Sequence, residues 1–237
     1  MPAPTPFKPA LLIVDLQEDF CPPSGALPVP CGRDIIAPIN TLLTLPFALK
    51  IATKDWHPAS HISFATNHPS SPPPFVSTTT IVHPTNAAHS YTSTLWPVHC
   101  VQQSAGAEFA AGFDVDKVNT TVYKGMDERV EMYSAFCDPF QWVEGCNAVA
   151  VSELSGLLKE KGVTDVYVAG LAMDYCVLAT ARDAVKFGFR TWVVREGTRA
   201  VGGEEGARTA EKEMREAGVT VVAMDGGEVA WVRELKE

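Results

Sequence analysis

Short β-rich apolar runs alternate with helical patterns along this chain, and this alternation constrains its fold more than any other feature. We expect six strands, at residues 10–14, 49–53, 118–123, 165–169, 190–194 and 219–223. The helical patterns lie near residues 34–43, 148–160, 175–187 and 204–217. Because strands that alternate with helices imply βαβ crossovers, we predict an α/β fold. Its core would be a doubly wound, mostly parallel sheet with helices on both faces, a Rossmann-like three-layer sandwich.

The composition excludes several classes of protein. Of the 237 residues, 46% are hydrophobic and 20% are charged, as in a soluble globular chain rather than a disordered or fibrous one. No apolar run approaches the roughly 18 residues that a membrane span needs. A formal charge of −9 without a basic run argues against nucleic acid. We therefore expect neither a membrane nor a nucleic acid as partner, and a homo-oligomer stays open.

Targeting signals and cysteine spacing indicate the cellular compartment of the protein. The first ten residues lack the apolar stretch of a secretory signal, so we expect a cytoplasmic protein. The final ELKE is no peroxisomal address, although a partner protein could carry the chain to the nucleus or to peroxisomes. Six cysteines without CxxC spacing are expected to be reduced thiols: Cys21, Cys31, Cys100, Cys137, Cys146 and Cys176.

One long stretch breaks the alternation. Residues 56–107 contain no Asp, Glu, Lys or Arg, and all six histidines lie within them. The middle of the stretch is rich in Pro, Ser and Thr and cannot form a long regular element. It could be a disordered linker, but its flanks, DWHPASHISF and LWPVHC, carry aromatic and apolar anchors. We therefore predict a single domain over 1–237, with an ordered, functional excursion at about 65–95.

The predicted strands bring reactive residue types to one edge of the sheet, because ligands bind beyond the carboxyl ends of parallel strands. Asp15, Lys124 and Cys176 follow three of these strands. Cys176 begins a helical pattern, where the helix N-terminus lowers a thiol pKa, so it is the candidate nucleophile. Asp15 at a buried strand end is the candidate general base, with Asp19 as a competitor. The alternatives are a packing cysteine, a capping aspartate and a surface lysine.

A second group of residues suits a metal ion. Asp55, His57 and His61 form the pattern D-x-H-x-x-x-H, and His99 follows in WPVHC. A carboxylate with imidazoles and no thiolate suits zinc, iron or manganese with open coordination positions. The alternative is a set of solvated loop histidines, the interpretation that we keep for His68, His83 and His89. We expect one divalent metal ion, zinc first, with iron or manganese as alternatives.

Six segments together resemble the nicotinamidase (pyrazinamidase) branch of the isochorismatase-like cysteine hydrolases. They are LLIVDLQEDFC (11–21), TKDWHPASHISFA (53–65), LWPVHCVQ (95–102), YKG (123–125), YSAF (133–136) and GLAMDYCVLATARDA (170–184). The last segment is typical of the whole superfamily, whereas DWHP with WPVHC narrows the resemblance to nicotinamidases. The sequence departs from familiar members in its Pro/Ser/Thr-rich insertion and in Cys137, which directly follows YSAF.

The resemblance implies a role for each matching residue. It implies a catalytic triad of Cys176, Asp15 and Lys124, and backbone oxyanion donors at Ala172 and Cys176, beyond a cis peptide between Leu171 and Ala172. It implies metal ligands at Asp55, His57 and His99, with His61 joining them in some members only. It also implies aromatic walls for a pyridine ring at Phe20, Trp96 and Tyr133.

The same resemblance implies the reaction. Nicotinamide would be hydrolysed to nicotinate and ammonia through a thioester on Cys176, as a step of NAD salvage, and pyrazinamide would be a second substrate. Within the enzyme class, the alternative is another small-amide or carbamoyl hydrolase with the same triad. Outside it, the chain could be a catalytically silent, metal-binding scaffold on this fold.

Overall fold

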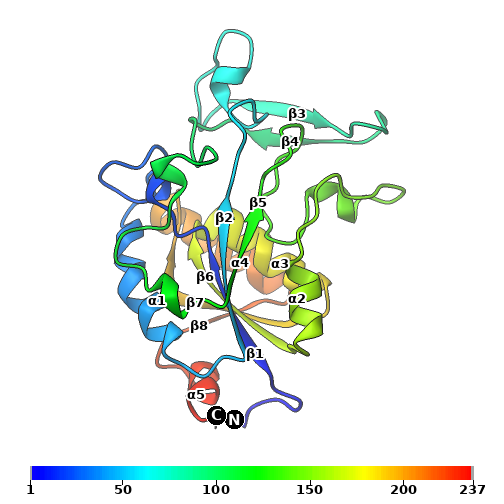
Figure 1. Cartoon of the computed structure of the whole chain (residues 1–237). Coiled ribbons are helices and arrows are strands. Elements are labelled where there is room, and N and C mark those ends of the chain that lie inside the picture. Colours follow the sequence, from blue (N-terminus) through cyan, green and yellow to red (C-terminus); the bar gives the residue numbers. More distant parts are fainter. Residues whose placement is uncertain (1, 236–237) are drawn as a thin grey trace.

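A single six-stranded sheet forms the centre of the computed structural model, which describes residues 2–235 (Figure 1). In spatial order its strands are β5 (Thr120–Lys124), β2 (Leu49–Asp55), β1 (Pro9–Val14), β6 (Asp165–Leu171), β7 (Arg190–Arg199) and β8 (Thr220–Val222). All neighbouring pairs run parallel. Each strand overlaps a predicted one, so the prediction of a doubly wound parallel sheet is confirmed.

Helices cover both faces of the sheet because the strands are apolar on both sides. In β1, Leu11 and Ile13 pack into one core, whereas Leu12 and Val14 pack into the other. The first core is closed by α1 (Ile36–Leu43) and α5 (Gly227–Arg233). The second is closed by α2 (Leu154–Glu160), α3 (Leu178–Lys186) and α4 (Gly203–Glu216). A strand buried on both faces reads as a continuous apolar run, as LLIV does.

Shorter turns connect these elements, and α3 is preceded by a π-helical turn at Met173–Val177. The 3-10 turns are Glu18–Phe20, Gly32–Ile35, Ala65–Asn67, Ala105–Ala107, Val115–Lys117 and Pro139–Trp142. The predicted helices at 34–43, 175–187 and 204–217 therefore correspond to α1, α3 and α4 with small shifts at their ends, whereas α5 was not predicted. None of the helices within residues 2–235 is both long and apolar enough to cross a membrane.

The predicted helix at 148–160 is wrong in its first half, because α2 begins only at Leu154. The Asp138 carboxylate accepts hydrogen bonds from the backbone N–H groups of Val149 and Ala150, at 2.6 and 2.5 Å. Val151 pairs with Cys137 in an antiparallel bridge. Since side-chain and bridge partners already satisfy this backbone, the segment remains irregular until α2 begins.

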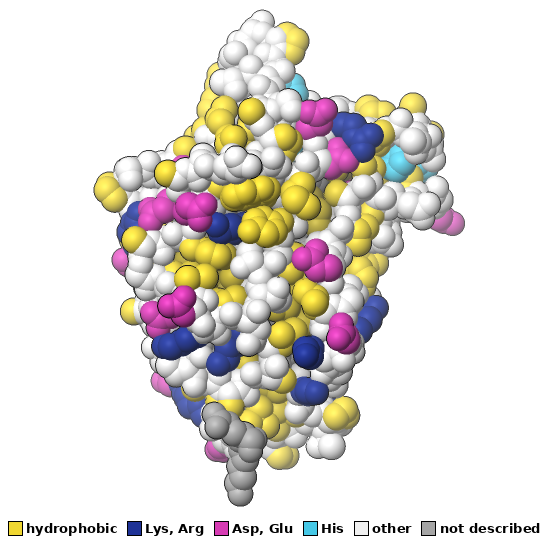
Figure 2. Space-filling model, in the orientation of Figure 1, with side chains coloured by type: hydrophobic (Ala, Val, Ile, Leu, Met, Phe, Trp, Pro, Cys, Tyr) yellow, Lys and Arg dark blue, Asp and Glu magenta, His cyan; other side chains and the backbone are white. Residues whose placement is uncertain are grey.

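The uncharged excursion is ordered and contains an antiparallel hairpin of β3 (Thr78–Val82) and β4 (Ser90–Thr94). Ile81 is buried and packs with Val130 and Phe140, which ties the hairpin to the rest of the chain. Figure 1 shows the hairpin beyond the ends of β2 and β5, and Figure 2 shows the projecting top of the molecule almost free of charged side chains. The excursion therefore lies at the sheet edge where the predicted site residues meet.

Gly170 of β6 pairs with Val14 of β1, and the space between the two strands leaves no room for a side chain at this position. Its φ is +120°, and a Cβ there would lie 2.0 Å from the Val14 carbonyl oxygen. We expect Gly170→Ala to lower the free energy of unfolding, measured by urea titration, by more than about 2 kcal/mol. Gly156→Ala, in open space on α2, is the matched control and should be neutral or stabilising. Equal stability of the two variants would contradict the close approach.

Candidate active site

Four strand ends deliver the predicted residues to one place. Asp15 follows β1, Asp55 ends β2, Lys124 ends β5, and Cys176 lies in the π-helical turn after β6. Because β5, β2, β1 and β6 are consecutive parallel neighbours, their carboxyl ends meet at one edge of the sheet. All four side chains are buried there.

The Lys124 ammonium lies at the centre of this group. Its Nζ is 2.9 Å from Asp15 Oδ2, 2.5 Å from Asp55 Oδ1 and 3.3 Å from Cys176 Sγ. Burial disfavours its charged form, but the two carboxylates outweigh burial and hold the pKa of Lys124 well above its ordinary value. Lys124 is therefore a permanent cation between two acids and a thiol, and not the surface lysine of the alternative interpretation.

Asp15 has the properties of a general base. Burial raises the pKa of Asp15 to about 6, against the opposing effect of Lys124. Thr53 donates a hydrogen bond of 2.5 Å to Oδ1, whereas Oδ2 is ion-paired with Lys124 Nζ at 2.9 Å. Oδ2, which Thr53 does not occupy, is therefore the oxygen on which Asp15 can take a proton. The competing Asp19 is occupied structurally, since its carboxylate accepts from the backbone N–H groups of Ala26 and Cys100.

Cys176 is a buried thiol with acid and base partners. Burial raises the pKa of Cys176 well above its ordinary value, although Lys124 opposes this effect. The expectation of a lowered pKa for Cys176 at the helix N-terminus is therefore wrong, because desolvation and the carboxylates of Asp15 and Asp55 act in the opposite direction. A carboxylate oxygen of Asp15 lies within 4.8 Å of Cys176 Sγ, close enough for a small shift to transfer the proton. The remaining cysteines are also free.

A buried donor set for a metal ion adjoins this group. Asp55, His57 and His99 each offer one ligand atom, and these atoms lie within 4.8 Å of one another. Nδ1 of His57 hydrogen-bonds the Gly125 carbonyl, and Nδ1 of His99 hydrogen-bonds the Pro97 carbonyl, both at 2.8 Å. A ring whose Nδ1–H is donated to a carbonyl keeps its lone pair on Nε2, so both rings are oriented as metal ligands. The donor set fits one divalent ion with open positions.

Gly125 makes room for His57. Its φ is +65°, and a Cβ at this position would lie 2.4 Å from the His57 ring. The YKG segment therefore needs a glycine at this position, because the His57 imidazole packs directly against the backbone there.

His61 lies beside the donor set rather than in it. Its ring packs against that of His57 at 4.1 Å between centroids, tilted by 34°. Its Nδ1 and Nε2 hydrogen-bond the Ser63 hydroxyl and the Val130 carbonyl, at 2.8 and 3.1 Å. Since protein groups occupy both nitrogens, the structure gives His61 a supporting contact with His57 rather than a free lone pair.

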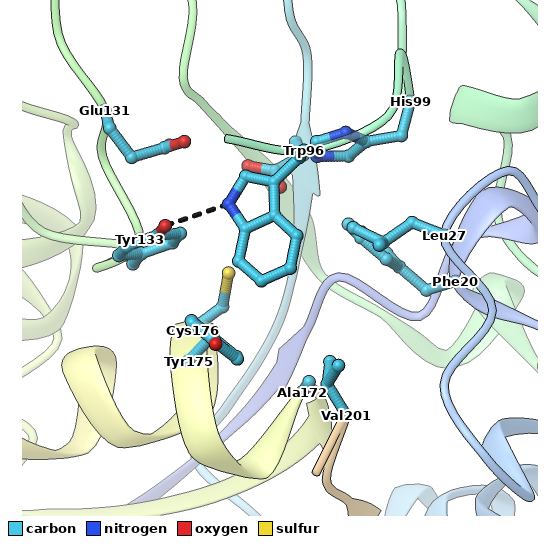
Figure 3. Close-up of a pocket in the computed structure, with 11 residues that line it drawn as sticks. Phe20, Leu27, Trp96, His99, Glu131, Tyr133, Ala172, Tyr175, Cys176 and Val201 are labelled. Carbon is cyan, nitrogen blue, oxygen red and sulfur yellow. Dashed lines mark hydrogen bonds between the residues drawn. The ribbon is translucent and has the colours of Figure 1, made fainter. Parts of the chain in front are cut away.

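A pocket opens above the Cys176 sulfur and is walled by the predicted aromatic residues (Figure 3). Phe20 stands on one side and Tyr133 on the other, and Trp96 donates a hydrogen bond of 2.9 Å from Nε1 to the Tyr133 hydroxyl. Its lining combines aromatic and apolar walls with a few polar groups, as small-molecule sites usually do. Sequence reasoning missed four lining residues, of which only Tyr175 lies in one of the six quoted segments: Leu27, Glu131, Tyr175 and Val201.

The tight turn after β6 brings the two residues predicted to carry the oxyanion donors to the pocket. The peptide between Leu171 and Ala172 is cis. The backbone N–H groups of Tyr175 and Val177 both donate to the Ala172 carbonyl at 3.1 Å and close the turn. Ala172 and Cys176 consequently line the same pocket.

Comparison with known proteins agrees with this geometry. The family model of the isochorismatase domain matches residues 9–225. A nicotinamidase of Schizosaccharomyces pombe is 36% identical over 219 residues, which cover 92% of this chain and 94% of that protein. The chain belongs to the isochorismatase family, on its nicotinamidase branch. Membership of this branch makes the chain an amidohydrolase.

Solved structures of family members share the fold. Yeast nicotinamidase bound to the inhibitor nicotinaldehyde superposes with a TM-score of 0.83 at 31% identity, over 91% of this chain and 99% of that one. A Pyrococcus horikoshii pyrazinamidase in complex with zinc gives a TM-score of 0.67 at 34% identity, over 91% and 99% of the two chains.

The donor set predicts how metal content responds to substitution. We expect His57→Ala and His99→Ala to reduce bound metal, measured by inductively coupled plasma mass spectrometry, at least tenfold because each removes one of three ligands. His61→Ala should retain most of the metal, and His89→Ala, in the exposed excursion, is the control. Full metal content in both of the first two variants would place the ion elsewhere.

Proposed function

We propose that this amidohydrolase converts nicotinamide to nicotinate and ammonia through a thioester on Cys176, and that it also accepts pyrazinamide. The observation that carries the proposal is the position of Cys176 Sγ. It lies 3.3 Å from Lys124 Nζ and beside Asp15, at the base of an aromatic pocket that adjoins an Asp-His-His donor set. The family's nicotinamidases support the same substrate. Nicotinamide hydrolysis would return the pyridine ring to NAD synthesis in the cytoplasm.

Acylation would begin with a proton transfer. Asp15 Oδ2, the oxygen on the Lys124 side, takes the Cys176 proton as the sulfur attacks the carboxamide carbon. The backbone N–H groups of Ala172 and Cys176 would stabilise the resulting oxyanion, roughly 3–4 kcal/mol per donor in comparable sites. When the C–N bond breaks, Asp15 returns the proton to the departing nitrogen and ammonia leaves.

Deacylation would use the same groups in reverse. Asp15 takes a proton from a water molecule whose oxygen attacks the thioester carbon, the C–S bond breaks, and the thiolate regains its proton from Asp15. Nicotinate is released. Throughout, Lys124 keeps its proton and stabilises the thiolate, because two carboxylates hold its ammonium in place.

The pyridine ring and the metal would share one side of the pocket. Phe20 and Trp96 supply apolar faces for the ring, and Phe20 also lies 5.5 Å from the His99 ring, between centroids. Asp55, His57 and His99 would hold the ion, zinc first, with iron or manganese as alternatives. When bound, the ion would supply positive charge and an open coordination position for the pyridine nitrogen.

We also propose that the chain forms one hydrolase domain. Phe75 of the excursion contacts Trp96 of the pocket edge-on, so the excursion packs on the site instead of forming a separate unit.

The direct test is ammonia release from nicotinamide by metal-loaded protein, with and without chelation and metal return. We expect turnover that falls on chelation, and a loss of at least about 10³-fold in Cys176→Ala. Cys146→Ala, which removes a thiol outside the pocket, is the control. Release from other amides but not nicotinamide would favour the alternative hydrolase. No release from any amide would favour the silent scaffold.

The assigned base predicts the acid limb of the pH profile. Asp15 must be ionised to accept the thiol proton, so kcat/KM should fall as the pH drops through about 6. The hydrogen bond from Thr53 lowers the pKa of Asp15, so Thr53→Val should raise this pKa and move the acid limb to higher pH. Thr191→Val, at another buried strand threonine, should leave the limb in place. If the acid limb of Thr53→Val stays at the pH of the parent, Asp15 is not the general base.

A further inference from the structure

A second groove lies behind the catalytic pocket, between the end of β7, one face of α4 and the loop at Pro30 and Cys31. With its open mouth it offers about 1100 Å³, more than the catalytic pocket. Its apolar residues are Met173, Ala200 and Ala207, and its charged residues are Arg195, Arg199, Glu204, Arg208 and Glu211. The proposed reaction uses none of them.

The groove and the catalytic pocket share a wall. Ala172 lines the pocket and the next residue, Met173, lines the groove. In the adjacent segment Val201 lines the pocket and Ala200 lines the groove. The two segments are neighbours because Leu171 pairs with Arg199 between β6 and β7. Consecutive residues of two paired segments thus face opposite cavities, so a ligand in the groove would contact the back of the turn that carries Cys176.

One arginine in the groove has no acidic partner among residues 2–235. Arg195 is neutralised by Glu211 through two hydrogen bonds of 2.8 and 2.9 Å, and Arg208 lies 3.8 Å from the exposed Glu204. Arg199 instead donates from Nη1 to the carbonyls of Thr198 and Glu196, at 2.7 and 3.5 Å. Its remaining N–H donors are therefore available to a carboxylate or a phosphate, the groups that a guanidinium binds best.

A buried hydroxyl beside this arginine is also unpartnered. Thr198 lines the groove and is only 2% exposed, and its Oγ1 makes no hydrogen bond. Buried hydroxyls normally have a partner, because an unsatisfied one costs about 1–3 kcal/mol. Since Oγ1 is closed off from solvent, the Thr198 side chain would rotate to meet an anion held by Arg199, which would supply the missing acceptor.

We propose that this groove binds a small organic anion. Its carboxylate or phosphate would lie on Arg199 and accept a hydrogen bond from Thr198, while its apolar part would pack on Met173, Ala200 and Ala207. This site is separate from the pocket of the proposed reaction, and the inference does not depend on which amide that pocket hydrolyses.

The test uses metal-loaded, ¹⁵N-labelled protein titrated with phenyl phosphate, benzoate and, as the uncharged reference, phenol. We expect at least one anion, but not phenol, to shift the Met173 and Ala172 amide resonances with a single Kd. The anion that responds identifies the head group. Arg199→Ala should raise this Kd at least tenfold, whereas Arg233→Ala, whose guanidinium likewise donates to a carbonyl, should not change it.

Thr198→Val separates a ligand contact from a structural one. Because the hydroxyl has no partner, the variant should unfold at the same urea concentration as the parent and yet raise the Kd roughly fivefold. Binding that is insensitive to both Arg199→Ala and Thr198→Val, or equal for phenol, would overturn the proposal. So would binding that disappears with the metal, since it would place the anion in the catalytic pocket.

Discussion

The ion cluster around Lys124 is the constraint on which the rest of the site depends. One ammonium, 1% exposed, lies between the carboxylates of Asp15 and Asp55 and the thiol of Cys176. Buried charges of this kind are tolerated only when they are paired, because desolvation costs several kcal/mol per ion. Every strand that ends at the cluster must therefore stop at the correct residue, and loss of the cation would leave two uncompensated carboxylates in the core.

Asp55 joins the two halves of the site. Its Oδ1 contacts Lys124 at 2.5 Å, while Oδ2 lies 3.5 Å from His57 Nε2 on the metal side. The ion cluster around Lys124 and the donor set therefore share one carboxylate, and a dication bound by Asp55 would change the electrostatic field at Lys124 and Cys176. The excursion matters for the same reason. The segments that flank it carry His57 and His99. Phe64 packs against both imidazole rings, and Trp96 lines the same pocket as His99.

Some elements could be predicted and others could not, for identifiable physical reasons. The central strands were found because residues buried on both faces form continuous apolar runs. The first half of the helix at 148–160 was wrong because the Asp138 side chain accepts hydrogen bonds from two N–H groups, 11 and 12 residues further along the chain. No helical periodicity shows such a contact. The β3–β4 hairpin was missed because its strands, TTTIV and SYTST, bury a single face and are otherwise polar like a loop.

The sequence by itself determined the fold class and the chemistry of Asp15, Asp55, His57, His99, Lys124 and Cys176, since residue types at strand ends and in motifs are local information. The tertiary structure determined the burial, the pKa values and the hydrogen-bond partners of these groups. Burial, which depends on contacts from the whole chain, raises the pKa of Asp15 to about 6 and that of Cys176 above its ordinary value. Packing alone brought Glu131 into the pocket, gave both nitrogens of His61 hydrogen-bond partners, and placed the Arg199 groove behind the turn that carries Cys176. Such features arise from distances between residues far apart in sequence, and no local pattern encodes them.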